Sequence, residues 1–236
     1  MPEQLSPDGR RIVVFDVNET LLDIEVLAPL FERVFGDRRV MREWFAQLIL
    51  YSEAITLAGA YQPFGQLGAG VLHMVAAVKG VEVHDPDLDE LRSLMQAIPA
   101  HPEVPAALAS LQKAGFRLVT LTNSAPQPGG GPLEHAGIAA FFEHQFSVAQ
   151  VGRYKPAPEP YRMVAKALKV ETSELWMVAC HAWDLIGAQR AGCAGAFVQR
   201  PGNALLPLST LPQPGVVGSD LMAVAEKIIA AHDASE

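Results

Sequence analysis

The pattern of hydrophobic and polar positions changes twice along the chain. A short apolar run from Ile12 to Phe15 ends abruptly at Asp16, and this pattern predicts a buried parallel strand. Between Ile24 and Ala100 the apolar residues recur at helical spacing, with no clear strand pattern. From Pro102 onward, short apolar runs alternate with helical segments. The predicted order is therefore one strand, a block of helices, and then a series of helix–strand units.

Four helix–strand units are predicted after Pro102. The helices are expected at Val104 to Ala114, Pro132 to Ala136, Glu159 to Leu168 and Trp183 to Ala191, and the strands at Arg117 to Leu121, Gln145 to Val148, Leu175 to Ala179 and Ala196 to Val198. Such alternation is typical of an α/β fold with a Rossmann-like, doubly wound parallel sheet. We therefore predict a catalytic core, residues 1–23 and 102–236, with an inserted helical cap domain, residues 24–101.

Composition and charge narrow the choice of partners. The 236 residues are 50% hydrophobic and carry a formal net charge of -8 with no basic run, so nucleic acids and acidic membrane surfaces are poor partners. There is no signal-peptide pattern and no apolar run of bilayer length. Two cysteines, Cys180 and Cys193, make no disulfide framework and suit a reducing cytoplasm. We expect a cytoplasmic protein that binds a small-molecule substrate; the sequence leaves a monomer and a homodimer both open.

Polar residues follow several of the predicted strands. They are Asp16 after the first strand, Thr122 and Asn123 after the second, His181 and Asp184 after a later one, and Lys155 just before a helix. Each residue alone has an ordinary structural use as a turn, a helix cap or a solvated lysine. Parallel strands bring their carboxyl ends to one edge, where open α/β sheets bind ligands. A carboxylate held there, such as Asp16, can act as a nucleophile.

The motifs that carry these residues resemble those of the haloacid dehalogenase superfamily, and within it the (S)-2-haloacid dehalogenases (type II). They are Phe15-Asp16-Val17-Asn18-Glu19-Thr20, Leu121-Thr122-Asn123, Tyr154-Lys155-Pro156 and His181-Ala182-Trp183-Asp184. The resemblance spans nearly the whole chain, because an inserted helical cap also fits. It implies a hydrolase acting on carbon–halide bonds, which removes halide from a short 2-haloacid through an aspartyl ester and needs no cofactor or metal.

The resemblance also implies a role for each matching residue. Asp16 would attack the halogen-bearing carbon, Lys155 would keep Asp16 ionised, and Asp184 would orient Lys155 and the hydrolytic water. Thr20 would position the reacting carboxylate. The substrate-binding set implied is Thr122, Asn123, Asn18, Tyr161, His181, Phe45 and Trp183. Of these, His181 stands where the dehalogenases usually carry asparagine.

At two motif positions this chain differs from the phosphatases of the superfamily, and both differences favour the dehalogenase interpretation. The phosphatases need a second aspartate two residues after the nucleophile, where this chain has Asn18. The phosphatases also usually carry a pair of acids in the last motif. In this chain Cys180 stands four residues before Asp184, so only one acid remains there. Both differences weaken a Mg²⁺ site, which uses carboxylates and phosphate oxygens. A phosphatase-type hydrolase that uses Mg²⁺, and a catalytically silent relative that acts by binding, remain the alternatives.

The cap departs from the dehalogenase pattern at one position. The dehalogenases carry an arginine in the first cap region that helps the halide to leave, and alignment on Trp44 places Phe45 there. Arg42 lies three residues earlier, on the same face of the predicted helix, and is a candidate for the missing charge. A cap that serves a more apolar substrate is the other interpretation.

Overall fold

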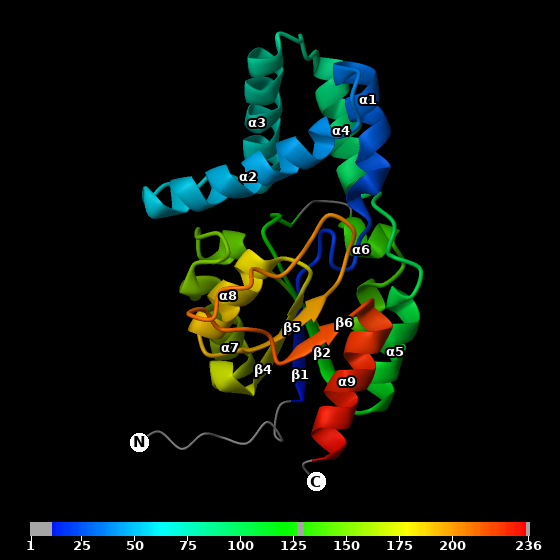
Figure 1. Cartoon of the computed structure of the whole chain (residues 1–236), viewed down its shortest axis with the longest axis vertical. Coiled ribbons are helices and arrows are strands. Elements are labelled where there is room, and N and C mark those ends of the chain that lie inside the picture. The colour runs from blue at the N-terminus through cyan, green and yellow to red at the C-terminus, as the bar shows by residue number, and fades with distance from the viewer. Residues whose placement is uncertain (1–10, 127–129, 235–236) are drawn as a thin grey trace.

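A parallel sheet of six strands forms the centre of the computed structural model, which describes residues 11–126 and 130–234 (Figure 1). The strands are β1 (Ile12–Phe15), β2 (Arg117–Thr122), β3 (His144–Ser147), β4 (Leu175–Ala179), β5 (Ala194–Val198) and β6 (Val216–Gly218), in the order β3-β2-β1-β4-β5-β6. Phe15 pairs with Thr120 on one side and Val178 on the other, so β1, β2 and β4 end at the same edge. The predicted Rossmann-like doubly wound sheet is confirmed.

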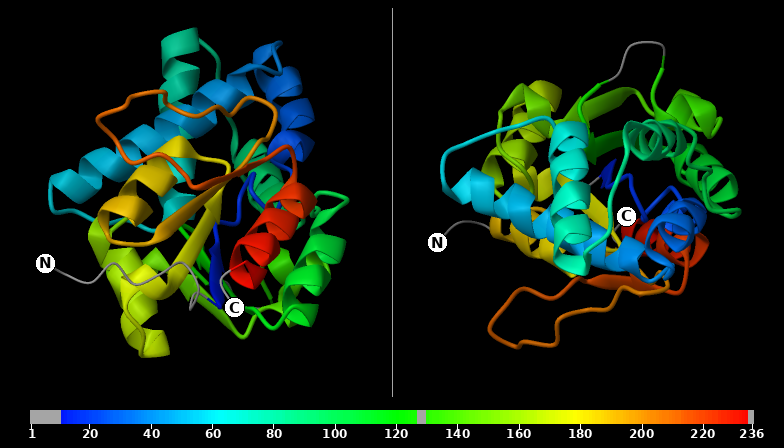
Figure 2. Two further views of the ribbon diagram at one scale, coloured as in Figure 1. Left: turned by 60° about the horizontal axis from the view of Figure 1, so that its bottom comes forward. Right: turned by 90° about the horizontal axis from the view of Figure 1, so that it is seen from above.

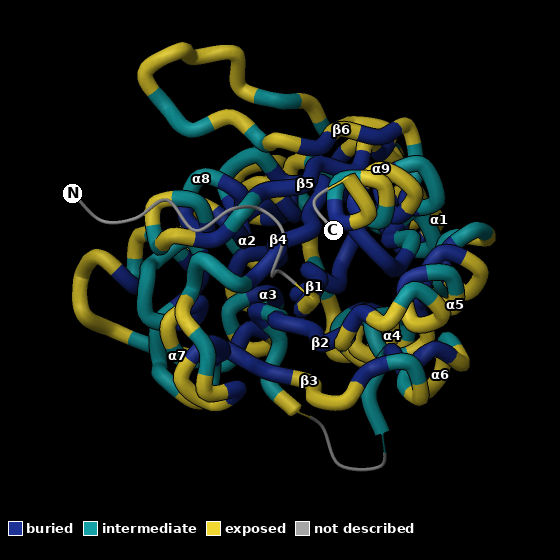
Figure 3. Tube along the Cα trace, turned by 90° about the horizontal axis from the view of Figure 1, so that it is seen from below, coloured by how far each residue is buried: buried dark blue, intermediate teal, exposed yellow. Residues whose placement is uncertain are grey.

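The central strands are buried on both faces, which explains their sequences. All residues of β1 and β4 are buried, and the trace seen from below shows these strands at the buried centre (Figure 3). A parallel sheet covered on both faces needs continuous apolar strands of this kind. Each large apolar side chain removed from water contributes about 1.5–3 kcal/mol. These strands are therefore a rigid support for the residues that follow them.

Helices cover both faces of the sheet (Figure 1). One side carries α5 (Val104–Lys113) and α9 (Leu221–Asp233), and the other carries α7 (Pro158–Leu168) and α8 (Ala182–Arg190); α6 (Pro132–His135) is a single turn. The predicted elements agree with the observed ones to within about two residues. The sequence analysis did not assign β6 and α9. No helix in the part of the chain that the structure describes combines the length and the apolarity needed to cross a membrane.

Helices between β1 and α5 lie together over the carboxyl edge of the sheet (Figures 1 and 2). They are the 3-10 helix Ile24–Leu27, α1 (Ala28–Phe35), α2 (Val40–Leu57), α3 (Phe64–Lys79) and α4 (Asp85–Gln96). Their own small core includes Trp44, whose Nε1 donates a hydrogen bond to the carbonyl of Gly68 at 2.9 Å. All of them fall within residues 24–101, for which we propose a cap domain.

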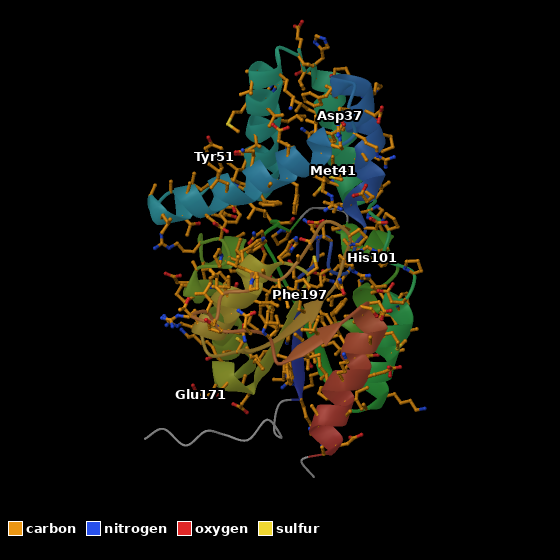
Figure 4. All side chains as sticks on the ribbon, in the orientation of Figure 1. Asp37, Met41, Tyr51, His101, Glu171 and Phe197 are labelled. Atoms are coloured by element: carbon orange, nitrogen blue, oxygen red, sulfur yellow. The ribbon has the colours of Figure 1, made fainter. Side chains whose placement is uncertain are left out.

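Two connecting segments join the helical cap to the core. The Asp23 amide donates to the Pro99 carbonyl at 2.9 Å, and the His101 amide donates to the Leu21 carbonyl at 3.0 Å. His101 lies at this junction (Figure 4). A long exposed loop, residues 199–215, runs beside the same junction (Figure 2). The chain therefore enters and leaves the cap next to the end of β1.

Candidate active site

Asp16 follows β1 directly and is buried at the edge of the sheet. Its amide donates to the Val178 carbonyl of β4 at 3.0 Å, which fixes the backbone, and only 5% of the residue is exposed. The Thr20 hydroxyl donates to Asp16 Oδ2 at 2.7 Å, and Lys155 Nζ donates to Oδ1 at 2.8 Å. Hydrogen bonds from the protein therefore replace most of the water that would solvate this carboxylate.

Lys155 is fully buried and donates all three of its ammonium hydrogens. Its Nζ lies 2.8 Å from Asp16 Oδ1, 2.6 Å from Asp184 Oδ2 and 3.0 Å from the Leu121 carbonyl. Tyr161 donates from its hydroxyl to Asp184 Oδ1 at 2.6 Å. A buried charge is tolerated only when it is paired and hydrogen-bonded in this way. The structure thus brings together the predicted residues Asp16, Lys155, Asp184 and Tyr161.

The two carboxyl groups of this cluster have different pKa values. Burial raises the pKa of Asp16, but the charge of Lys155 and the hydrogen bond from His181 outweigh burial and hold that pKa well below its usual range. Burial and the charge of Asp16 raise the pKa of Asp184, against the opposing charge of Lys155. Pairs of acids whose environments separate their pKa values are typical of acid–base sites. Asp16 fits the ionised nucleophile, and Asp184 fits the group that exchanges protons.

A glycine on α8 sets the distance between Lys155 and Asp184. Asp184 lies in the first turn of α8, and Gly187 one turn later faces the loop that carries Lys155. A Cβ added at Gly187 would lie 2.5 Å from the carbonyl oxygen of Pro156. The Lys155 amide also donates to Asn123 Oδ1 at 3.2 Å. Close packing of backbone on backbone therefore places the lysine between its two carboxylates.

His181 lies between two carboxylates. Its Nδ1 is 3.0 Å from Asp16 Oδ2, and its Nε2 is 2.8 Å from Glu19 Oε2. Ionised carboxylates only accept hydrogen bonds, so both ring nitrogens must carry hydrogen and the ring is an imidazolium. Burial lowers the pKa of His181, but Cys180, Asp16 and Glu19 raise that pKa well above its ordinary value. The predicted substrate-binding role of His181 stays a prediction, and its observed partners are Asp16 and Glu19.

Aromatic rings enclose the imidazolium from the core and from the cap. The Trp183 ring stacks on His181 at 5.0 Å between centroids, and the Phe45 ring of α2 lies 5.9 Å away. These contacts explain why Phe45 is apolar although it stands at the place of a charged residue in the resemblance. The positive charge next to Phe45 comes from the histidine of the core.

Glu19 belongs to this charged cluster, although the sequence analysis gave it no role. Its φ of 62° is left-handed, which a residue other than glycine rarely adopts, and Glu19 is 4% exposed. His101 Nε2 contacts the Glu19 carbonyl at 2.9 Å, and Asn203 Nδ2 donates to Oε1 at 3.2 Å. Burial raises the pKa of Glu19, but His181 and Arg42 outweigh burial and lower it. The one signal in the sequence was an acidic residue inside the turn of the nucleophile motif.

Arg42 reaches from the cap to Glu19. Its Nη1 pairs with Glu19 Oε1, and its Nη2 and Nε donate to Glu25 Oε1 at 2.6 and 3.1 Å. The guanidinium nitrogens thus face these two carboxylates, and the interpretation of Arg42 as the charge that receives the halide stays a prediction. Through these ion pairs the arginine joins α2 to the turn that follows Asp16.

A cavity of about 500 Å³ lies between the cap and the core. Asn18, Val17 and Thr122 form part of its wall on the core side, and its cap side is largely apolar, with Trp44 and Phe64. Asp16 is not among the residues that line the cavity, although its neighbours Val17 and Asn18 are. Two of the predicted substrate-binding residues, Asn18 and Thr122, thus reach the cavity. The other five, Asn123, Tyr161, His181, Phe45 and Trp183, pack around the charged cluster instead.

The residues around Asp16 do not fit Mg²⁺. Among the described residues, one group of acidic, histidine and cysteine side chains is close enough to share an ion, and it is Asp16, Cys180 and His181. Mg²⁺ prefers six oxygen ligands, whereas sulfur and imidazole suit softer ions. Both His181 nitrogens already contact carboxylates, and the two Asp184 oxygens accept from Lys155 and Tyr161. The absence of a metal from the reaction remains a prediction.

Comparison with known proteins identifies the family. Residues 11–192 match the profile of the haloacid dehalogenase-like hydrolases. The chain is 31% identical to (S)-2-haloacid dehalogenase 2 of Pseudomonas sp. (strain CBS-3), over 89% of this chain and 93% of that protein. Its fold superposes on an L-2-haloacid dehalogenase with a TM-score of 0.86 at 27% identity, covering 92% and 98% of the two chains.

A second solved structure, of a dehalogenase with an intermediate complex, gives a TM-score of 0.83 at 25% identity and covers 91% of this chain and 95% of its own. The matches extend through both the cap and the core. This protein belongs to the haloacid dehalogenase-like hydrolases.

Proposed function

We propose that the protein hydrolyses the carbon–halogen bond of a short 2-haloacid through an ester on Asp16. The observation that carries this proposal is a buried Asp16 carboxylate, kept ionised by Lys155, with an amide rather than an acid at Asn18. The names of the relatives, which are 2-haloacid dehalogenases, support the same reaction. We also propose that the enzyme works in the cytoplasm, since its two cysteines are buried thiols.

The first step needs a nucleophile and no acid. An Asp16 oxygen attacks C2 of the haloacid, the carbon–halogen bond breaks, and the halide leaves with the electron pair. A halide is stable as an anion, so no group must protonate it. An amide at Asn18 is therefore sufficient here, whereas a phosphatase would need an acid to protonate the leaving oxygen. In-line attack inverts the configuration at C2.

The second step regenerates the enzyme. Water attacks the carbonyl carbon of the Asp16 ester, Asp184 accepts a proton from the water, and a 2-hydroxy acid is released. The oxygen that Asp16 donated leaves in the product, and an oxygen from water takes its place. When Asp16 becomes a neutral ester, Lys155 keeps its contact with the Asp184 carboxylate until Asp184 takes the proton from the water.

Multiple turnovers in H₂¹⁸O test this function. We expect wild-type enzyme to release halide from (S)-2-chloropropionate, and the peptide that contains Asp16 to become heavier. Asp16→Asn should release no halide while its circular dichroism spectrum stays unchanged. An Asp16 peptide without label after many turnovers would rule out the ester.

The phosphatase alternative makes the opposite predictions. Water would then attack phosphorus, so the aspartate would keep its own oxygens and a chelator would stop turnover until Mg²⁺ is added back. Because the donor set around Asp16 does not fit Mg²⁺, we expect halide release to be unchanged in EDTA. A phosphate-ester panel run beside the haloacids completes the comparison.

A further inference from the structure

The two oxygens of the Asp16 carboxylate have different surroundings. Oδ2 accepts two hydrogen bonds, from Thr20 Oγ1 at 2.7 Å and His181 Nδ1 at 3.0 Å. Oδ1 accepts one, from Lys155 Nζ at 2.8 Å. Each hydrogen bond withdraws electron density from the oxygen that accepts it. The oxygen with one donor therefore keeps more of its nucleophilic character.

We propose that Oδ1 attacks the substrate, and that Thr20 and His181 form an oxyanion hole for Oδ2 when the Asp16 ester is hydrolysed, with Glu19 as the residue that positions and charges His181. This inference rests on the proposed ester mechanism and adds the groups that stabilise its second transition state. Donors 2.7–3.1 Å from a developing oxyanion are the arrangement that such catalysis requires. The two observed distances, 2.7 and 3.0 Å, fall within that range.

Both steps use only the substrate, water and side chains of the site to form and break bonds and to move protons. Alkylation forms the bond from Oδ1 to C2 and breaks the carbon–halogen bond, whose electron pair leaves with the halide. Water then bonds to the carboxyl carbon and gives a proton to Asp184, and the carbonyl pair moves onto Oδ2. When this pair returns, the bond from the carboxyl carbon to Oδ1 breaks. The leaving alkoxide takes a proton from Lys155, Lys155 regains one from Asp184, and the last proton passes from Asp16 to solvent.

The Thr20 hydroxyl has one hydrogen, and its surroundings direct it to Oδ2. The Cys180 amide donates to Thr20 Oγ1 at 3.0 Å, so the hydroxyl oxygen is already an acceptor on that side. Its hydrogen is then available for Asp16 Oδ2 at 2.7 Å, while Cys180 Sγ lies farther away at 3.5 Å. Both members of the proposed hole are therefore in position before the reaction begins.

Glu19 becomes more important once the ester has formed. Alkylation removes the negative charge of Asp16, which is one of the two carboxylate partners of His181. Glu19 remains as the buried counter-charge, and Arg42 and Asn203 hold its other oxygen. An imidazolium buried without such a partner would lose its proton, because burial disfavours the charged form. Glu19 thus keeps a charged donor on Oδ2 in the step in which negative charge develops there.

Rapid-quench mass spectrometry with (S)-2-chloropropionate tests the proposal, because it follows alkylation and ester hydrolysis separately. We expect His181→Leu, which leaves no side-chain donor for Oδ2 at this position, to slow ester hydrolysis by about 10²–10³-fold, as for the loss of one oxyanion-hole donor. Alkylation should slow far less, so the variant should give a burst of one halide per enzyme and accumulate the Asp16 ester. Glu19→Gln should also accumulate the Asp16 ester, and it should move the alkaline limb of the hydrolysis rate to lower pH.

Two comparisons separate this role from a structural one. Thr20→Ser keeps the hydroxyl and should hydrolyse the ester faster than Thr20→Val, which removes it. His73→Leu and Glu32→Gln make the same chemical changes at exposed positions of the cap and should match wild type. Circular dichroism establishes that each variant is folded.

The possible results have distinct meanings. Ester that accumulates in the His181 and Glu19 variants supports the proposal. Hydrolysis at the wild-type rate in these variants, or equal losses in both steps with no ester, overturns the oxyanion hole and leaves the ester mechanism in place. Wild-type enzyme that forms no adduct on Asp16 overturns both.

Discussion

The charged side chains of the site are arranged in pairs, since each buried charge contacts an opposite one. Lys155 lies between Asp16 and Asp184, and His181 lies between Asp16 and Glu19. Burial of each group alone would be strongly unfavourable, and the pairs offset this cost. The cluster keeps the nucleophile ionised and its hydrogen-bond donors charged.

Removal of the central cation should therefore affect stability as well as activity. Lys155→Met leaves two carboxylates buried with no cation between them, and such a change costs about 3–5 kcal/mol. We expect the free energy of unfolding in urea to fall by that order at pH 7 and to recover partly at acidic pH, where the carboxylates become protonated. Lys166→Met on the exposed face of α7 is the matched control. Equal stability of the two variants would contradict the pairing.

His181 predicts how stability and ester hydrolysis depend on pH. Its neighbours Asp16, Cys180 and Glu19 raise its pKa well above the ordinary 6.5, and Arg42 faces Glu19 from the other side. The contribution of His181 to the free energy of unfolding is complete below pH 6.5 and is lost as the pH rises through its folded pKa. Ester hydrolysis should fall over the same alkaline range.

His181→Asn should remove this alkaline dependence from both measurements. The depressed pKa of Asp16 acts at the opposite end, since its contribution is present above its ordinary 3.8 and is lost only as the pH falls through the lower folded value. Alkylation should therefore keep its rate into mildly acidic solution. If the alkaline limb persists in His181→Asn, the titration of another group must cause it.

At the scale of elements, the precision of the site depends on how closely α8 packs against the loop before α7. Gly187 permits this contact, since an added Cβ would lie 2.5 Å from the Pro156 carbonyl oxygen. Lys155 immediately precedes Pro156, and Asp184 lies one turn before Gly187. A shift of either element would lengthen the ion pair between them.

Gly187→Ala should therefore reduce both stability and turnover. Overpacking of this kind costs about 1–3 kcal/mol, and we expect kcat to fall more than KM rises, because the lysine and Asp184 move apart. Gly70→Ala is the control, since Gly70 is an exposed glycine of α3 whose added Cβ meets nothing within 4 Å. There the change should stabilise the helix by about 0.5–1 kcal/mol. Urea denaturation and steady-state halide release measure both effects.

In the whole molecule, the cavity lies where the cap meets the core. Its volume of about 500 Å³ exceeds what a two- or three-carbon acid fills, and among its described lining residues Arg92 alone is charged. Added methylene groups of a substrate would contact Trp44, Leu48 and Phe64 rather than water. Each buried methylene contributes about 0.8 kcal/mol.

Longer substrates should therefore bind more tightly. From 2-chloropropionate to 2-chlorohexanoate we expect KM to fall about three- to fourfold per methylene, which corresponds to that free energy, with little change in kcat. Leu48→Ala should weaken this trend at the longer acids and leave 2-chloropropionate nearly unaffected. A KM that rises with chain length would show that the cavity is closed to the substrate.

The sequence by itself determined the sheet and the positions of the first reacting groups. Continuous short apolar runs that alternate with helical segments are typical of a covered parallel sheet, and a polar residue directly after such a run lies at its edge, as Asp16 does. It did not reveal β6, whose three residues are too short to show a pattern, or α9, whose apolar repeat was not assigned.

Only the tertiary structure decided the partners of the charges. Glu19 and His181 are separated by 162 positions in the chain, and they meet because β1 and β4 are neighbours in the sheet. No local pattern encodes that contact, just as none predicts that Arg42 of the cap pairs with Glu19 of the core. Strand identity depends on local hydrophobicity, whereas the choice of ion-pair partners depends on distances that exist only after the chain has folded.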